Sequence, residues 1–90
     1  MLNFALCDDN LSIVTKLAKM LEAIFIKNKL PGEIVLVETN PNELLEFINS
    51  ENSVDVLLMD IDLKSNINGI DLVNTIRTTN KSMYIIFTTA

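Results

Sequence analysis

Two hydrophobic patterns alternate along the chain. Short, nearly continuous apolar runs are typical of strands buried on both faces of a sheet, and they fall at residues 2–7, 34–37, 54–63 and 83–87. Between them, apolar residues recur every three or four positions, which predicts three amphipathic helices. These helices are expected to follow Asn10, Asn40 and Asn68 and to end before Leu30, Ser50 and Asn80. Because strands and helices alternate, we predict an α/β domain with right-handed parallel crossovers.

The ends of these helices carry capping signals. Asn10 and Asn40 can each accept a hydrogen bond from a first turn, and Pro41 suits the first helical position. Glu43 lies where it can reach back to Asn40, as in a capping box. Gly69 is expected to start the third helix in a structural role. The first helix is expected to stop at the Leu30-Pro31-Gly32 sequence.

The same spacing predicts which helical residues face the core. For the first helix they are Val14, Leu17, Ala18, Leu21, Ile24 and Phe25; for the second, Leu44, Leu45, Phe47 and Ile48; for the third, Ile70, Val73 and Ile76.

The third predicted strand ends in an acidic residue. Asp60 lies where this strand emerges, and in open α/β sheets ligands collect at the carboxyl ends of the strands. One common doubly wound order, the flavodoxin-like order 2-1-3-4, places the first and third strands side by side. We predict this order, which brings Asp8 and Asp9, after the first strand, against Asp60.

Three neighbouring carboxylates repel one another, so a cation is expected among them. Mg²⁺ prefers hard oxygen ligands, and it neutralises charge on a transferring phosphoryl group. Asp60 is the predicted nucleophile, which would form an acyl phosphate. Thr89, at the carboxyl end of the fourth strand, could donate a hydrogen bond to a phosphoryl oxygen.

Composition narrows the range of partners. The chain has 90 residues, 49% of them hydrophobic, which predicts a single small domain with a core. A net charge of −5 disfavours direct nucleic acid binding, which needs clustered Lys and Arg. No apolar run is long enough for a membrane span or a signal peptide, so we expect a cytoplasmic protein. The single cysteine, Cys7, fits a reducing compartment and is expected to be a small buried residue.

Four short motifs together resemble the receiver domain of a two-component response regulator. They are residues 7–10 (CDDN), 57–63 (LLMDIDL), 68–69 (NG) and 85–90 (IIFTTA). The long spacing between Asp60 and the Asn68-Gly69 pair is similar in particular to receivers attached to LytTR-type DNA-binding domains, the group that includes quorum-sensing regulators.

This resemblance implies a role for each matching residue. Asp60 would accept a phosphoryl group from a sensor histidine kinase, and Asp8 and Asp9 would hold Mg²⁺ directly or through water. The backbone carbonyl of Asp62 would complete the protein ligands, and Thr89 would be the switch hydroxyl. The resemblance implies a phosphorylated signalling domain rather than an enzyme, which regulates transcription through an output domain outside residues 1–90.

The family pattern extends beyond this sequence. Receivers continue through a fourth helix, a fifth strand that carries a lysine, and a fifth helix, whereas this sequence ends at Ala90. Neither Lys64 nor Lys81 holds the position of that lysine. We therefore expect residues 1–90 to be the N-terminal part of a receiver domain. The fourth strand would then be an open edge, and its exposed apolar residues 85–87 predict self-association.

Two other functions fit parts of the sequence. The chain could be a receiver-like interaction module that binds partners without phosphorylation. Alternatively, Asp60 and Asp62 resemble the D-x-D pair of haloacid-dehalogenase-type phosphatases, although that pair normally follows the first strand. Dinucleotide binding is disfavoured because the chain has only two glycines and no glycine-rich loop.

Overall fold

The computed structural model describes residues 1–50, 53–61 and 69–88. Strands and helices alternate as the sequence predicts: β1 (Leu2–Cys7), α1 (Leu11–Lys27), β2 (Gly32–Glu38), α2 (Pro41–Asn49), β3 (Val56–Asp60), α3 (Gly69–Arg77) and β4 (Tyr84–Thr88). The four strands pair in parallel in the order β2-β1-β3-β4. The predicted doubly wound, flavodoxin-like sheet is therefore confirmed.

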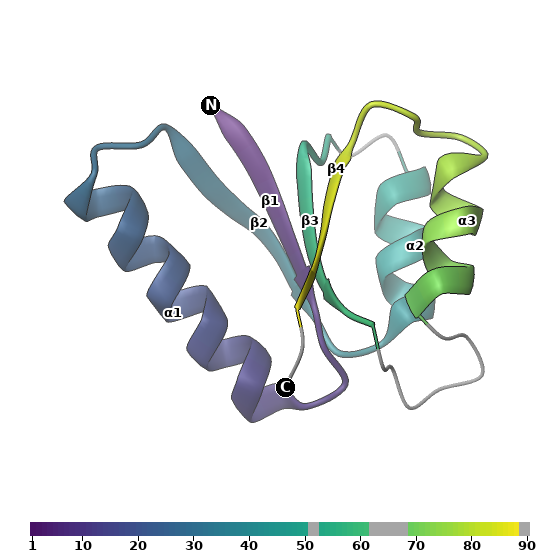
Figure 1. The fold of residues 1–90 in the computed structure, drawn as a ribbon, viewed down its shortest axis with the longest axis horizontal. Helices are drawn as coiled ribbons and strands as arrows, with labels where there is room; N and C mark the ends of the chain where they lie inside the picture. Colours follow the sequence, from purple (N-terminus) through teal and green to yellow (C-terminus); the bar gives the residue numbers. More distant parts are fainter. Residues whose placement is uncertain (51–52, 62–68, 89–90) are drawn as a thin grey trace.

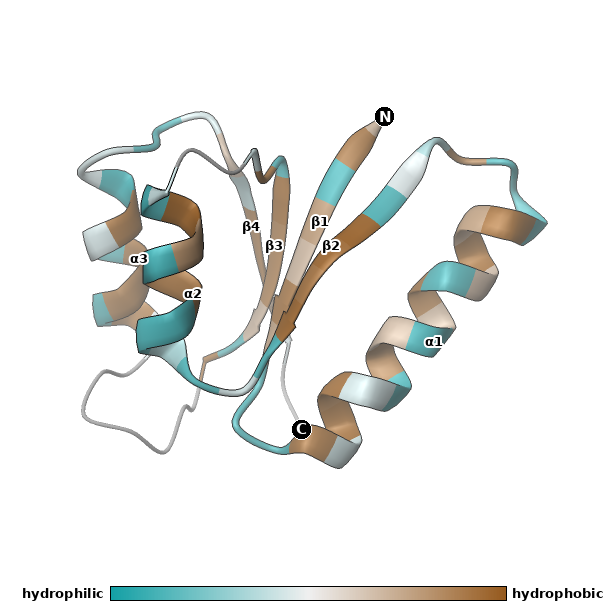
Figure 2. Cartoon of the chain, turned by 180° about the vertical axis from the view of Figure 1, so that it is seen from behind, coloured by the Kyte–Doolittle hydropathy of each residue, from teal (hydrophilic) through white to brown (hydrophobic). Residues whose placement is uncertain are grey.

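Helices cover both faces of the sheet, with α1 on one side and α2 and α3 on the other (Figure 1). The larger core cluster lies between the sheet and α2 and α3. Its buried members are Ala5, Cys7, Leu44, Val54, Leu57, Met59, Leu72, Ile76 and Met83. A smaller cluster of Leu6, Val14 and Ala18 lies beneath α1. The brown, hydrophobic colouring of the central strands in Figure 2 matches their burial between these two layers. No helix in the described parts of the chain has the length and apolarity to cross a membrane.

The strand register brings the carboxyl ends of the strands to one edge of the sheet. Cys7 at the end of β1 lies beside Met59 of β3, and Asp60 lies beside Thr88 of β4. The residues that follow β1 and those that end β3 must therefore meet at this edge, as the predicted strand order requires.

The predicted caps of α1 and α2 are present, but the predicted capping box at the start of α2 is not. The Asn10 side chain accepts a hydrogen bond from the N–H of Ile13 at 3.1 Å, which confirms it as the cap of α1. Asn40 likewise caps α2. The capping box prediction for Glu43 is wrong, because the N–H of Asn40 donates to the carboxylate of Glu38 at 3.2 Å.

The end of α1 differs from the expectation that Leu30-Pro31-Gly32 stops it. The helix ends at Lys27, and Lys29 adopts a left-handed conformation with φ of 53°. The N–H of Leu30 then donates to the carbonyl of Phe25 at 2.9 Å, and that of Lys29 to Ile26 at 3.3 Å. This is a Schellman motif with lysine where glycine is usual. The helix therefore ends through its own backbone hydrogen bonds, before the proline.

The predicted core face of α3 is partly wrong. Ile76 is buried and Val73 half-buried, but Ile70 is 55% exposed and Leu72 is fully buried in its place. In α1, Ile24 is also more exposed than predicted. A short helix with many apolar positions can bury more than one of its sides, and packing against the sheet decides which side is buried.

Asp55 forms a polar clamp at the opposite, amino edge of the sheet. Its carboxylate accepts a hydrogen bond from the N–H of Asn3 at 2.7 Å, and its own N–H donates to the carbonyl of Asn3 at 2.8 Å. Its carbonyl accepts from the N–H of Tyr84 at 2.9 Å. The residue just before β3 therefore joins β1 and β4.

Replacing Asp55 with alanine should destabilise the fold by about 1–3 kcal/mol, because the half-buried N–H of Asn3 would lose its charged acceptor. Urea unfolding would measure this change. Asp55→Asn is the matched control, since its amide oxygen can still accept the bond. Equal stability of Asp55→Ala and the natural chain would contradict the clamp.

Candidate functional site

Three carboxylates converge at the carboxyl edge of the sheet. Asp8 and Asp9 follow β1, and Asp60 is the last residue of β3. One carboxylate oxygen from each residue lies within 4.8 Å of one from each of the other two. Asp8 is 4% exposed, Asp60 is 9% exposed and Asp9 is half-buried. The juxtaposition predicted from the strand order is thus present, and the cluster has one partly open side through Asp9.

Asp8 is fixed by its backbone and by Asn10, the residue that caps α1. Its N–H donates to the carbonyl of Glu38 at 3.1 Å, which extends the β1–β2 pairing past Cys7. Its carboxylate accepts a hydrogen bond from the N–H of Asn10 at 2.9 Å. Burial raises the pKa of Asp8, the Asn10 bond opposes this, and the charges of Asp60 and Asp9 raise the pKa further. The negative charge of Asp8 is therefore disfavoured unless a cation balances it.

Asp60 is held between a buried strand and the start of α3. Met59 and Leu57 of the same strand are fully buried in the larger core cluster. The N–H of Gly69 donates to the carbonyl of Ile61 at 3.2 Å, which brings the first residue of α3 to the residue after Asp60. Gly69 begins α3, as predicted.

Three predicted site features fall outside the described residues. They are the backbone carbonyl of Asp62, the hydroxyl of Thr89 and Asn68 as a possible cap of the third helix. Their roles stay predictions: that of Asp62 rests on the resemblance, that of Thr89 on the resemblance and its place at a strand end, and that of Asn68 on the helix-start pattern.

Sequence reasoning missed Glu38 as a supporting residue of the site. Its carbonyl holds the backbone of Asp8, and its carboxylate accepts hydrogen bonds from the N–H groups of Thr39 and Asn40 at 3.0 and 3.2 Å. An acid at the end of a predicted strand was the available signal, but the bond from the N–H of Asp8 to the carbonyl of Glu38 depends on the β1–β2 register.

Cys7 is a buried neighbour of the acids. It is 1% exposed, and burial together with the nearby carboxylates raises the pKa of its thiol to about 12. The thiol therefore stays protonated and packs as a small apolar group, as predicted.

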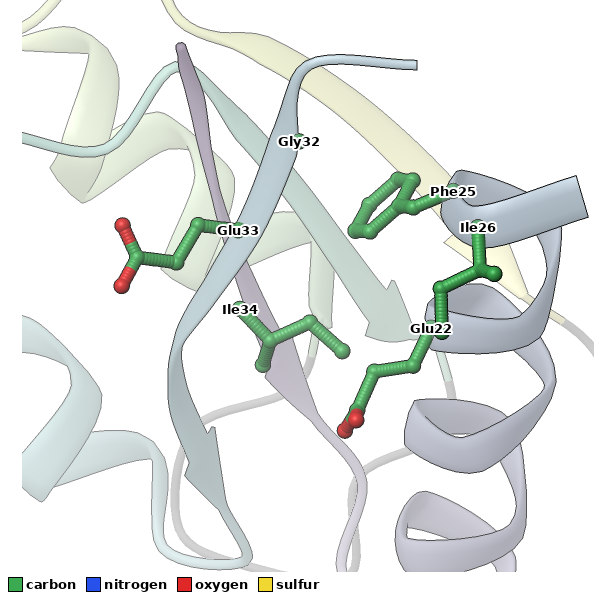
Figure 3. Close-up of a pocket in the computed structure, with 6 residues that line it drawn as sticks. All are labelled: Glu22, Phe25, Ile26, Gly32, Glu33 and Ile34. Carbon is green, nitrogen blue, oxygen red and sulfur yellow. The ribbon is translucent and has the colours of Figure 1, made fainter. Parts of the chain in front are cut away.

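A groove lies away from the acids, between α1 and β2. This groove of about 320 Å³ is lined by Glu22, Phe25, Ile26, Gly32, Glu33 and Ile34. Figure 3 shows the Phe25 ring beside Gly32, with Glu33 directed away from α1. Gly32 pairs with Leu2 at the amino edge of the sheet, so the groove is remote from the carboxylates.

Comparisons with known proteins point to one family. The response regulator receiver domain family matches residues 4–90. Accessory gene regulator protein A of Staphylococcus aureus strain N315 is 31% identical over 85 residues, which cover 94% of this chain and 36% of the relative. The chain thus spans about a third of the length of this curated relative. The predicted similarity to receivers of LytTR-type regulators is confirmed by this match.

Solved structures share the fold. A response regulator receiver domain protein from Clostridium thermocellum superposes with a TM-score of 0.79 and 22% identity over 99% of this chain and 65% of its own. The MaeR response regulator bound to beryllium trifluoride gives a TM-score of 0.80 with 24% identity over 100% of this chain and 68% of its own. With its doubly wound sheet and its match over residues 4–90, this chain belongs to the response regulator receiver domain family.

Proposed function

We propose that this chain accepts a phosphoryl group on Asp60, with Mg²⁺ held by Asp8, Asp9 and Asp60. The observation that carries the proposal is the convergence of these three carboxylates within 4.8 Å at the carboxyl edge of a receiver sheet. The donor would be a sensor histidine kinase, so the chain would be a signalling domain of a two-component system rather than a free-standing enzyme.

The donor set fits Mg²⁺. All three side chains offer hard oxygen ligands. The pKa of Asp8 is raised first by burial and then by the neighbouring acids, and a bound cation would offset both effects. The resemblance adds the backbone carbonyl of Asp62 as a further ligand. When bound, Mg²⁺ would neutralise charge on the transferring phosphoryl group.

The reaction would use the carboxylates in different roles. A carboxylate oxygen of Asp60 attacks phosphorus while the bond from phosphorus to the donor breaks, and the bonding electrons leave with the donor. The product is an acyl phosphate on Asp60. Asp8 and Asp9 would hold the cation, directly or through water, and the hydroxyl of Thr89 would donate a hydrogen bond to a phosphoryl oxygen.

Residues 1–90 would act within a longer regulator. The chain covers 36% of accessory gene regulator protein A and 65–68% of the two solved receivers. We infer that it is the N-terminal part of a receiver that controls transcription in the cytoplasm through a separate output domain. Its net charge of −5 disfavours direct DNA binding by this segment.

Beryllium trifluoride offers a direct test of the site. MaeR is a response regulator bound to this ion, and we propose that this chain binds it on Asp60. Adding it with Mg²⁺ should shift the amide resonances of Asp8, Asp9 and Asp60 in an NMR titration. A chelator should reverse the shifts. Shifts without Mg²⁺, or none at these residues, would contradict the proposed site.

We also propose that residues 1–90 self-associate through the outer surface of β4. Tyr84 is 73% exposed, and Ile86 and Phe87 are exposed too, on a strand at the edge of the described sheet. Light scattering should give a mass above that of a monomer at high concentration, and Ile86→Lys should restore the monomer. Ile70→Lys, on exposed α3 surface, is the control and should leave the mass unchanged. A monomer at all concentrations would contradict this interface.

A further inference from the structure

We propose that Gly69 is a positioning residue for Asp60: the absence of a side chain at this position allows α3 to start directly against the backbone that holds the phosphoacceptor. This inference rests on the proposed function of Asp60. It assigns Gly69 a part in the placement of the nucleophile, in addition to its place at the start of α3.

The start of α3 lies too close to the backbone of Asp60 and Ile61 for a residue with a Cβ atom at position 69. A Cβ atom built on Gly69 would lie 2.7 Å from the carbonyl oxygen of Ile61, 2.8 Å from its Cα and 3.0 Å from the carbonyl oxygen of Asp60. All three atoms belong to the backbone, so no side-chain rotation can relieve the overlap. Gly69 has no positive φ, so the requirement concerns space and not backbone conformation.

The strand end, rather than the helix, would yield to an added side chain. Leu72 and Ile76 anchor α3 in the larger core cluster and are almost fully buried. Ile61, by contrast, is 37% exposed and lies just beyond the end of β3. A methyl group at position 69 would therefore push against the backbone of Asp60 and Ile61.

The size of this displacement matters for the chemistry. The contact to the carbonyl oxygen of Ile61 must lengthen from 2.7 Å to about 3.4 Å before it becomes an ordinary van der Waals contact. A misplacement of about 1 Å in a reacting group can lower a rate on the order of a hundredfold. A shift of the Asp60 backbone would also separate its carboxylate from those of Asp8 and Asp9.

The test compares the two glycines of the chain in the full-length protein. Gly69→Ala introduces the collision beside Asp60. Gly32→Ala is the matched control, because its Cβ would lie 2.7 Å from the Phe25 ring, at the far edge of the sheet. Each variant is measured for its urea unfolding midpoint, its Mg²⁺ affinity by calorimetry and its rate of labelling by acetyl phosphate per folded molecule.

We expect both variants to lose stability and only Gly69→Ala to lose site function. Its labelling rate should fall about tenfold or more, with a weaker Mg²⁺ affinity, while Gly32→Ala keeps the natural values. Natural values for Gly69→Ala, or equal losses in both variants, would overturn the positioning role. If the natural protein itself is neither labelled nor binds Mg²⁺, the proposed function fails, and the inference fails with it.

A variant that unfolds can still be tested. Trimethylamine N-oxide favours the compact state of a protein, so the measurements on Gly69→Ala are repeated in this osmolyte with the natural protein beside it. A refolded Gly69→Ala that is labelled at the natural rate would overturn the inference, and one that stays slow would support it.

Discussion

Replacing Asp60 with asparagine should abolish phosphoryl labelling. Asparagine has nearly the same shape, so the end of β3 and the adjoining core should persist, but its neutral amide is a far weaker nucleophile than a carboxylate. Incubation with acetyl phosphate and Mg²⁺ should therefore add no phosphoryl group to the variant, as measured by intact mass. Its urea unfolding midpoint in chelator should not fall below the natural value, because the charge of Asp60 repels that of Asp8 in the folded chain.

Asp71→Asn provides the control for this experiment. Asp71 is an exposed acid in the first turn of α3, outside the carboxylate cluster. Its replacement removes the same charge and should leave labelling intact. Persistent labelling of Asp60→Asn would show that the phosphoryl group is carried elsewhere, and equal losses in both variants would show that the effect is not specific to Asp60.

Replacing Asp8 with asparagine should weaken Mg²⁺ binding on the order of a hundredfold, measured by calorimetry. Changes to residues that only support metal ligands already lower affinity by roughly ten- to a hundredfold, and Asp8 is proposed to hold the ion itself, directly or through water. Labelling by acetyl phosphate should fall in parallel at limiting Mg²⁺. An unchanged Mg²⁺ affinity would remove Asp8 from the metal site.

The same substitution should raise stability when Mg²⁺ is absent. Burial and the neighbouring acids raise the pKa of Asp8 above its ordinary value of 3.8, so the folded chain binds a proton more tightly than the unfolded chain. Stability is therefore lost as the pH rises from below 3.8 through the folded pKa. Asparagine carries no charge and avoids this loss.

Urea unfolding in chelator checks this effect of Asp8→Asn. The variant should be more stable than the natural chain near neutral pH, and the difference should shrink as the pH falls below 3.8. Saturating Mg²⁺ should reverse the order, because ligand binding stabilises the natural fold more. Lower stability of the variant in chelator at neutral pH would contradict the charge repulsion.

The sequence predicts the fold well because its elements alternate with distinct periods. A parallel α/β arrangement and the 2-1-3-4 order follow from this alternation and from general rules of strand connection. The same rules predict that Asp8, Asp9 and Asp60 meet, since each follows or ends a strand that points to the same edge. The convergence of these three acids is thus readable from the sequence.

Details that depend on tertiary contacts were less predictable. The phase of α3 buries Leu72 instead of Ile70, because the helix must begin against the backbone of Ile61 and pack its next turns on the sheet. The bond from the N–H of Asp8 to the carbonyl of Glu38 and the clamp at Asp55 both depend on which strands pair and in what register. Local sequence does not specify these partners, which lie on other strands or turns.

The most direct test of the central claim is the intact mass of the full-length protein after incubation with acetyl phosphate, once with Mg²⁺ and once with chelator. The proposed site predicts a gain of one phosphoryl group that requires Mg²⁺, located on the peptide that contains Asp60. A gain that persists in chelator, a gain on another residue, or no gain at all would contradict the assignment of Asp8, Asp9 and Asp60 as a phosphoacceptor site.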